Sequence, residues 1–70
     1  MNYYLQESGR IQYLWSEEEE SGQLNLEAHR VIDDPIDWLP YEGGHHEKVH
    51  ISQFKDLKKI SEEEAFTILL

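Results

Sequence analysis

The sequence predicts a small α+β domain, in which an antiparallel meander of three to four strands carries one short C-terminal helix on one face. Two β-rich runs near the N-terminus flank the turn-forming pair Ser8-Gly9. Polar and apolar residues alternate again over residues 47–54. The last ten residues begin with a helix-capping pattern. At 70 residues the chain forms a single domain, residues 1–70, which buries only about 60% of its unfolded surface.

The first two strands are expected on either side of Ser8-Gly9, because glycine accepts the positive φ angle of a tight turn. In the second strand the odd-numbered residues from Ile11 to Trp15 are apolar or aromatic. Successive side chains of a strand point to opposite faces, so these three share one face. We assign that face to the core.

The segment SEEEESGQ, residues 16–23, is expected to be a solvated connection, although Ser16 with Glu19 could instead cap a helix. Four consecutive glutamates repel one another there, and Ser21-Gly22 interrupts any helix. Residues 23–32 fit either a strand or a helical stripe. We favour the strand because it follows a hairpin closely, and we place a bulge near Arg30, where the alternation breaks.

Asp33-Asp34-Pro35 ends this strand, because proline cannot donate a hydrogen bond to a β-ladder. A loop then runs to about residue 46, and residues 47–54 are expected to form a fourth strand. Residues 55–60 suggest a turn followed by a few extended residues.

The C-terminal helix is expected to begin at Ser61. Ser61 is a favourable N-cap, and Glu64 completes a capping box. Three glutamates at residues 62–64 also stabilise the helix, because their negative charges lie near the positive end of the helix dipole. A helix this short is unstable alone, so we expect its apolar side to dock on the sheet.

The predicted core takes apolar side chains from the strands and the helix. These side chains are Tyr3, Leu5, Ile11, Tyr13, Trp15, Val49, Ile51, Phe66 and Leu69. A small open sheet leaves unpaired edges that can pair with another chain, so a homodimer is compatible with this fold.

The chain is strongly acidic, with 15 Asp and Glu against six Lys and Arg, and its net charge is −9. A field of this sign repels nucleic acids and anionic membranes and attracts basic proteins, although acidity also serves solubility. The chain has no cysteine, no signal-like N-terminal run and no apolar stretch of about 18 residues. We therefore expect a cytoplasmic protein that contacts neither nucleic acid nor membrane directly.

Catalytic signatures do not occur in the sequence. No serine lies in a Gly-x-Ser-x-Gly elbow, and Gly43-Gly44 lacks the spacing and the lysine of a phosphate loop. Asp33, Asp34 and Asp37 are more simply explained as turn residues than as a catalytic pair, because a chain this short supplies no cleft. We predict that the protein is not an enzyme and uses no cofactor.

Three histidines, His45, His46 and His50, lie close together in the sequence. On a strand His46 and His50 share a face, but at ~3.3 Å per residue they lie about 13 Å apart, which is too far to bind one ion. We therefore predict no metal site. A histidine-based, metal-responsive or pH-responsive binding protein stays as an alternative, because free histidine titrates near neutral pH.

Acidic and aromatic side chains combine in the loop around Trp38. Tyr and Trp are favoured at binding hot spots, and the carboxylates add negative charge around them. The alternative is that Trp38 folds back and covers one end of the sheet. The candidate partner-binding residues are Glu17, Glu18, Glu19, Glu20, Asp34, Asp37, Trp38, Tyr41 and Glu42.

Together these features indicate a non-enzymatic, acidic protein-binding module of the inhibitor or immunity type, which occupies a basic, nucleic-acid-binding surface of its target. The acidic runs at residues 17–20 and 62–64 would replace the phosphates of a nucleic acid if they share one side of the fold. Reversing the charge of Glu18 and Glu20 is then expected to slow association. A small structural subunit of a larger assembly is a further alternative.

Overall fold

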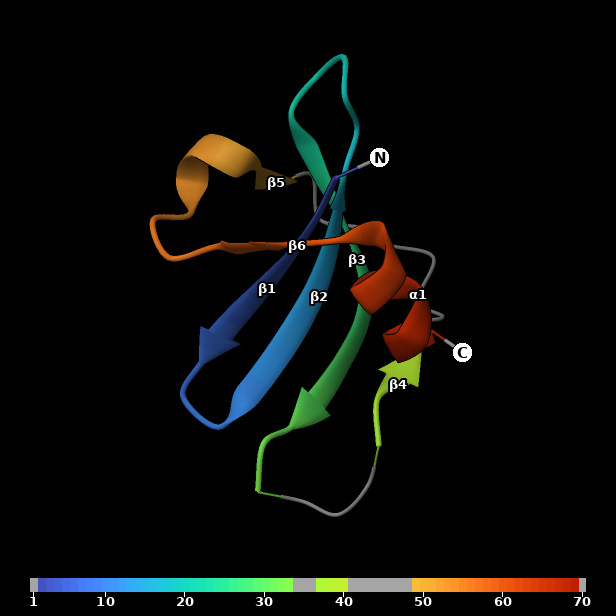
Figure 1. Ribbon diagram of the computed structural model, residues 1–70. Coiled ribbons are helices and arrows are strands. Elements are labelled where there is room, and N and C mark those ends of the chain that lie inside the picture. Colours follow the sequence, from blue (N-terminus) through green and yellow to red (C-terminus); the bar gives the residue numbers. More distant parts are fainter. Residues whose placement is uncertain (1, 34–36, 41–48, 70) are drawn as a thin grey trace.

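The computed structural model describes residues 2–33, 37–40 and 49–69. These residues form one antiparallel sheet and one C-terminal helix, so the predicted α+β class is confirmed (Figure 1). The sheet has six strands rather than three to four, in the order β4-β3-β2-β1-β6, and β5 also pairs with β3. The elements are β1 (Asn2–Ser8), β2 (Ile11–Glu17), β3 (Gln23–Val31), β4 (Leu39–Pro40), β5 (Val49–His50), a short 3-10 helix η1 (Ile51–Gln53), β6 (Lys58–Ile60) and α1 (Glu62–Leu69).

β1 and β2 form the predicted hairpin, in continuous register from the Asn2–Glu17 pair to the Ser8–Ile11 pair. Gly9 has a φ of 61°, which suits the first turn position of a type II′ hairpin. A Cβ atom added at Gly9 would meet nothing within 4 Å. The backbone conformation alone therefore favours glycine at this position.

β3 confirms that residues 23–31 form a strand, and it carries a bulge. The register with β2 shifts after the Leu14–Ala28 pair, which leaves Glu27 as the extra residue. The position predicted for the bulge, near Arg30, is wrong. Arg30 stays in regular register with β2, so the break in apolar alternation there reflects a polar side chain on a regular strand.

The two short strands β4 and β5 both pair with β3. The predicted fourth strand, residues 47–54, is wrong beyond His50, because η1 begins at Ile51. The first two residues of that predicted strand, 47–48, lie outside the described residues. The His50 side chain accepts a hydrogen bond from the Ser52 amide (3.1 Å), and the Gln53 side chain accepts one from the His50 amide (3.0 Å). Such local side-chain bonds compete with a β-ladder.

β6 confirms the extended residues expected before the helix. It pairs with β1 and forms the outer edge of the sheet with two exposed lysines. A short, charged edge strand resists pairing with another sheet edge.

Both faces of the sheet are covered in part. We call the face under α1 the helix face; its buried cluster is Tyr3, Leu14, Ala28, Ile60 and Ala65. We call the opposite face the Trp15 face. There the Trp15 ring lies 5.4 Å from the Phe54 ring, which follows η1, and its indole N–H donates to Gln6 Oε1 (2.8 Å).

The predicted core is therefore correct only in part. Tyr3 and Trp15 are buried and Leu5 is partly buried, whereas Phe66 is 49% and Leu69 39% exposed. The side chains that are only half-buried are Ile11, Tyr13, Val49 and Ile51. The core face assigned to β2 is correct only in part, because Trp15 is buried on that face, whereas Leu14 is fully buried on the opposite face in the cluster with Ala65 of α1.

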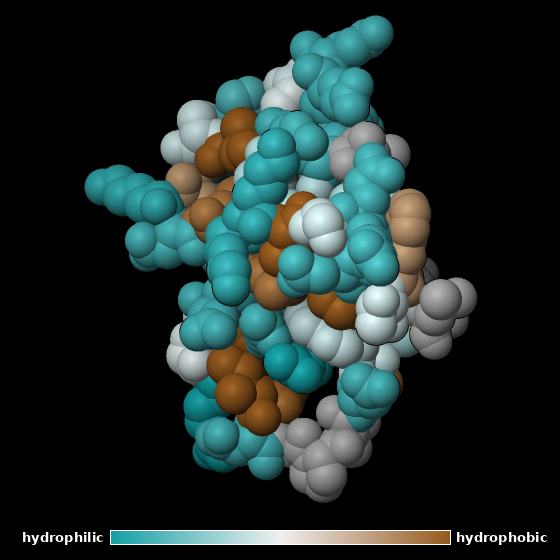
Figure 2. Space-filling view, in the orientation of Figure 1, coloured by the Kyte–Doolittle hydropathy of each residue, from teal (hydrophilic) through white to brown (hydrophobic). Residues whose placement is uncertain are grey.

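Figure 2 shows a mostly hydrophilic surface with a hydrophobic cluster in the lower part of the view, near the end of β3. Val31 and Ile32, at that end of β3, are 38% and 42% exposed.

Candidate functional site

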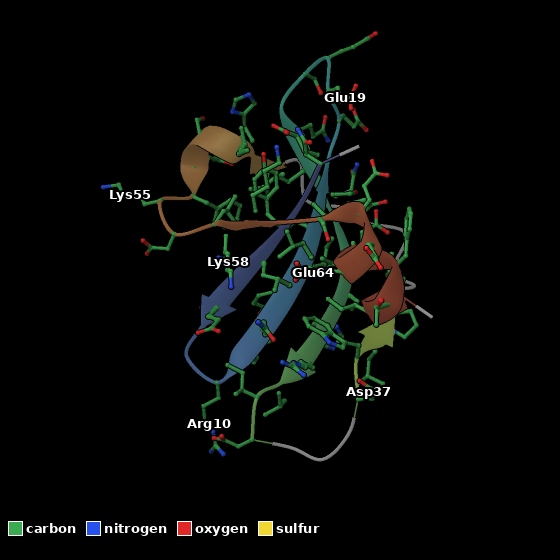
Figure 3. All side chains as sticks on the ribbon, viewed as in Figure 1. Arg10, Glu19, Asp37, Lys55, Lys58 and Glu64 are labelled. Atoms are coloured by element: carbon green, nitrogen blue, oxygen red, sulfur yellow. The ribbon has the colours of Figure 1, made fainter. Side chains whose placement is uncertain are left out.

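Strand register brings the two acidic runs of the chain to the same half of the sheet. Near the end of β2, Ser16 pairs with Tyr3, and Tyr3 pairs with Ile60 of β6. α1 begins two residues after Ile60. In Figure 3, Glu19 lies at the end of the molecule opposite the β1–β2 turn with Arg10, and Glu64 lies between these two ends, on α1. We call this half the acidic half, and its carboxylates are Glu17–Glu20, Glu27 and Glu62–Glu64.

Glu17 is tied into the fold at the end of β2. Its Oε1 atom accepts hydrogen bonds from Asn2 Nδ2 (3.0 Å) and from the Tyr4 hydroxyl (3.2 Å). Desolvation raises the pKa of Tyr4, and the hydrogen bond to Glu17 and the charge of Glu17 raise it further. Glu17 therefore orders the sheet end as well as contributing charge.

Glu18 organises the turn between β2 and β3. Its amide donates to the Gln23 carbonyl (2.9 Å), and its carbonyl accepts from the Gly22 amide (2.9 Å). Its carboxylate accepts from Ser21 Oγ (3.3 Å) and Asn25 Nδ2 (3.4 Å). A charge reversal at Glu18 therefore disturbs the turn as well as the charge. Glu20 is exposed at the same turn and suits such a test better.

Glu27 belongs to the acidic half, although the sequence did not indicate it. The bulge turns its side chain to the helix face, where it accepts a hydrogen bond from the buried Ser16 hydroxyl (2.7 Å). No pattern in the sequence locates this bulge, because it depends on the pairing of β3 with β2.

The start of α1 confirms the predicted N-cap. The Glu64 amide donates to Ser61 Oγ (3.1 Å), and residues 62–64 form an acidic first turn. All three glutamates are exposed. Their negative charges interact favourably with the positive end of the helix dipole, and they add to the charge of the acidic half.

Among the described basic residues, Arg10 and Lys55 lie apart from the acidic half, whereas Lys59 of β6 pairs with Tyr4 next to the Tyr3–Ile60 pair. Arg10 pairs with Asp33 (3.2 Å) at the end of the sheet that holds the β1–β2 turn. Figure 3 shows Lys55 and Lys58 near the β6 edge, away from Glu19 and Asp37, and draws Glu64 at about the level of Lys58. The fold therefore separates Arg10 and Lys55 from the acidic runs, whereas Lys58 and Lys59 lie in β6, directly before the 62–64 run.

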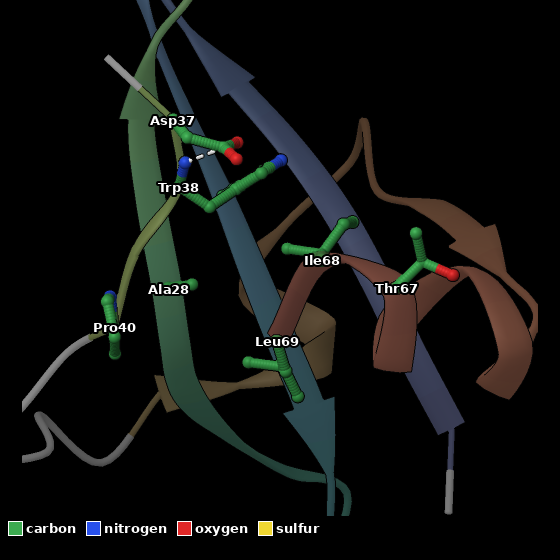
Figure 4. A pocket seen from close by; sticks show the side chains of 7 residues that line it. All are labelled: Ala28, Asp37, Trp38, Pro40, Thr67, Ile68 and Leu69. Carbon is green, nitrogen blue, oxygen red and sulfur yellow. Dashed lines mark hydrogen bonds between the residues drawn. The ribbon is translucent and has the colours of Figure 1, made fainter.

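A groove of about 190 Å³ lies between β3, β4 and the C-terminal half of α1. Trp38 forms one wall, and Ile68 and Leu69 project toward it from α1 (Figure 4). Asp37 lies beside the tryptophan, and its Oδ1 atom accepts a hydrogen bond from the Trp38 amide (2.8 Å). Two candidate binding residues, Asp37 and Trp38, thus line one groove. The sequence did not indicate its helix wall, because Leu69 was assigned to the core and Ile68 to no site.

Trp38 is half-buried and packs against the helix-face core. The Arg30 guanidinium lies 4.9 Å from the centre of its ring, and Arg30 Nε donates to Gln12 Oε1 (2.8 Å). The tryptophan therefore folds back toward the sheet and still contributes to a surface groove.

Asp34, Tyr41 and Glu42, from the predicted binding loop, lie outside the described residues, as do His45 and His46. His50 is described, and its Nδ1 atom is engaged in the cap of η1. Within residues 2–33, 37–40 and 49–69, no three potential metal ligands of the His, Cys, Asp or Glu type gather at one point.

No protein-family model, curated protein or solved structure matches this chain. In the described part of the chain, no helix is both long enough and apolar enough to cross a membrane.

Proposed function

We propose that this chain is a non-enzymatic, acidic protein-binding module, which occupies a basic, nucleic-acid-binding surface of a target protein as an inhibitor or immunity-type protein does. The observation that carries the proposal is the convergence of the 17–20 and 62–64 glutamate runs on one half of the sheet. Clustered charge of one sign steers a partner of opposite charge and repels competitors of like charge.

Carboxylates held by a strand end, a turn and a helix start resemble a nucleic-acid backbone in one physical respect, which is an array of negative charge. A protein that neutralises phosphates does so with Lys and Arg, and those side chains also pair with carboxylates. Hydrogen bonds to Glu17 and Glu18 hold this half of the sheet in place. A pre-organised array binds with a smaller loss of entropy than a mobile tail.

The test is affinity capture from the native cell lysate at about 0.05 M and about 0.5 M salt, which shortens the screening length from about 14 Å to about 4 Å. We expect a basic, nucleic-acid-binding protein at low salt and its loss at high salt. Duplex DNA or RNA added at low salt should displace the chain from this partner, because both compete for one surface.

Two results would oppose the proposal. A specific partner that stays bound at about 0.5 M salt points to an apolar contact, since screening leaves such contacts intact. A low-salt capture that contains no basic protein removes the charge-based interpretation.

A further inference from the structure

We propose that the groove beside Trp38 holds one basic side chain, a lysine or an arginine, of the partner protein. This inference rests on the proposed function, because it assigns a site to one residue of the basic surface that the acidic half approaches. It concerns a separate part of the molecule, the C-terminal half of α1 and the residues next to β4.

The size of the groove suits a single long side chain. Its volume is about 190 Å³, whereas sites for small molecules and cofactors usually exceed about 300 Å³. Trp38 and Pro40 line it from one side, and Ile68 and Leu69 line it from the helix. These apolar walls match the aliphatic stem of lysine or arginine, which packs along apolar surface while its charged head stays near water.

The charge of the groove selects a cation. Asp37 is the charged residue among the described lining residues, and it is exposed beside the Trp38 ring. One Asp37 oxygen accepts from the Trp38 amide, which orients the carboxylate at the groove (Figure 4). A carboxylate next to an indole ring recognises ammonium and guanidinium groups. Arg30 lies over the Trp38 ring and does not line the groove, so we assign the partner's charged head to Asp37 and its aliphatic stem to the apolar walls.

The groove lies within reach of a partner bound at the acidic half. α1 has eight residues, so its ends are separated by about 12 Å. Its first turn carries Glu62–Glu64, and its last turn carries Leu69. A single basic surface can therefore contact the glutamates at one end of α1 and insert one side chain at the other end.

The test uses small probes and the two tryptophan indole N–H signals in ¹⁵N-resolved NMR spectra of the full chain. The probes are Nα-acetyl-arginine amide, Nα-acetyl-lysine amide and the uncharged Nα-acetyl-norleucine amide. We expect the arginine or the lysine probe to shift the Trp38 signal, with a dissociation constant on the order of 1–10 mM for a ligand of this size. Trp15 is the internal reference, because its indole is bonded to Gln6 on the opposite face.

The matched variants are Asp37→Asn and Asp56→Asn. The amide introduced by Asp37→Asn keeps an oxygen that accepts from the Trp38 amide but has no charge, so this variant should bind the probe about two- to fivefold more weakly, as expected for an exposed ion pair. Asp56 is exposed and lies outside the groove, and its variant should bind as the wild type does. Comparing the dissociation constants of the arginine and lysine probes shows which head group the groove prefers.

Equal shifts with the norleucine probe, shifts of Trp15 as large as those of Trp38, or no response of Trp38 would overturn the inference. None of these results bears on the proposed function, because lysate capture depends on the acidic half. Conversely, a groove that binds the arginine probe in a chain that captures no basic protein would reject the proposed function and leave a cation-binding groove.

Discussion

At the scale of single residues, Glu17 and Glu20 show that a run of like residues can have unlike roles. Glu17 accepts hydrogen bonds from Asn2 and Tyr4, whereas Glu20 is exposed at the turn. The sequence predicted a solvated acidic connection, and it offered no basis for distinguishing the four glutamates. The difference depends on which residues of β1 pair with the end of β2, so it belongs to the tertiary structure.

The raised pKa of Tyr4 leads to an alkaline prediction. The neutral phenol is favoured in the folded chain, so its stabilisation is complete below about pH 10 and is lost as the pH rises through the raised pKa. At neutral pH, Tyr4→Phe should cost about 0.5–1.5 kcal/mol of unfolding free energy, for one lost hydrogen bond. The advantage of wild type over this variant should then shrink above about pH 10. Urea unfolding from about pH 7 to about pH 11 measures the unfolding free energy of wild type and of Tyr4→Phe as a function of pH. A constant difference between the two proteins over this range would contradict the prediction.

At the scale of elements, the sequence predicted the long strands and the start of the helix better than the bounds of the short elements. β1, β2 and the start of α1 follow from a turn glycine, β-forming side chains and a capping serine. β4 has only two residues and was not predicted, whereas β5, Val49–His50, lies within the strand predicted for residues 47–54, which was too long. The core face of β2 could not be predicted from alternation, because both faces of the sheet are covered. Trp15 packs on Phe54 on one face, and Leu14 packs under α1 on the other.

The cap of η1 provides a prediction at this scale. His50 Nδ1 accepts a hydrogen bond from the Ser52 amide and also lies 2.8 Å from Ser52 Oγ. Asparagine also accepts at an N-cap and alanine does not, so His50→Ala should lose about 0.5–2 kcal/mol and His50→Asn much less. Chemical unfolding of both variants measures this difference. Equal losses would show that the cap does not stabilise the fold.

The His50 ring also limits what can replace Gly22. A Cβ atom on Gly22 would lie 2.8 Å from His50 Nε2, and the φ of Gly22 is +70°. Both the contact and the backbone conformation therefore favour glycine where the acidic turn meets η1.

At the scale of the whole molecule, composition predicted the class and charge of the domain but not the arrangement of that charge. A chain of 70 residues with a net charge of −9 and no cysteine indicates a small, acidic, single domain before any element is placed. The acidic half exists because β6 pairs with β1 in one register and β3 carries a bulge at Glu27. Neither feature has a local sequence signal, since both depend on contacts between distant residues.

The central claim is that the acidic half drives association with a basic partner. The most direct measurement is the association rate constant for the captured partner at about 0.05 M salt. It compares wild type with the variant carrying Glu20→Gln and Glu63→Gln, and with a control carrying Glu7→Gln and Asp56→Asn. All four residues are exposed, and both variants remove the same charge.

We expect the acidic-half variant to associate more slowly than the control by a factor on the order of three to ten, because the removed charges steer the encounter. Equal rates for the two variants would mean that only the net charge matters, and an unchanged rate in both would mean that charge does not guide binding; either result would contradict the claim.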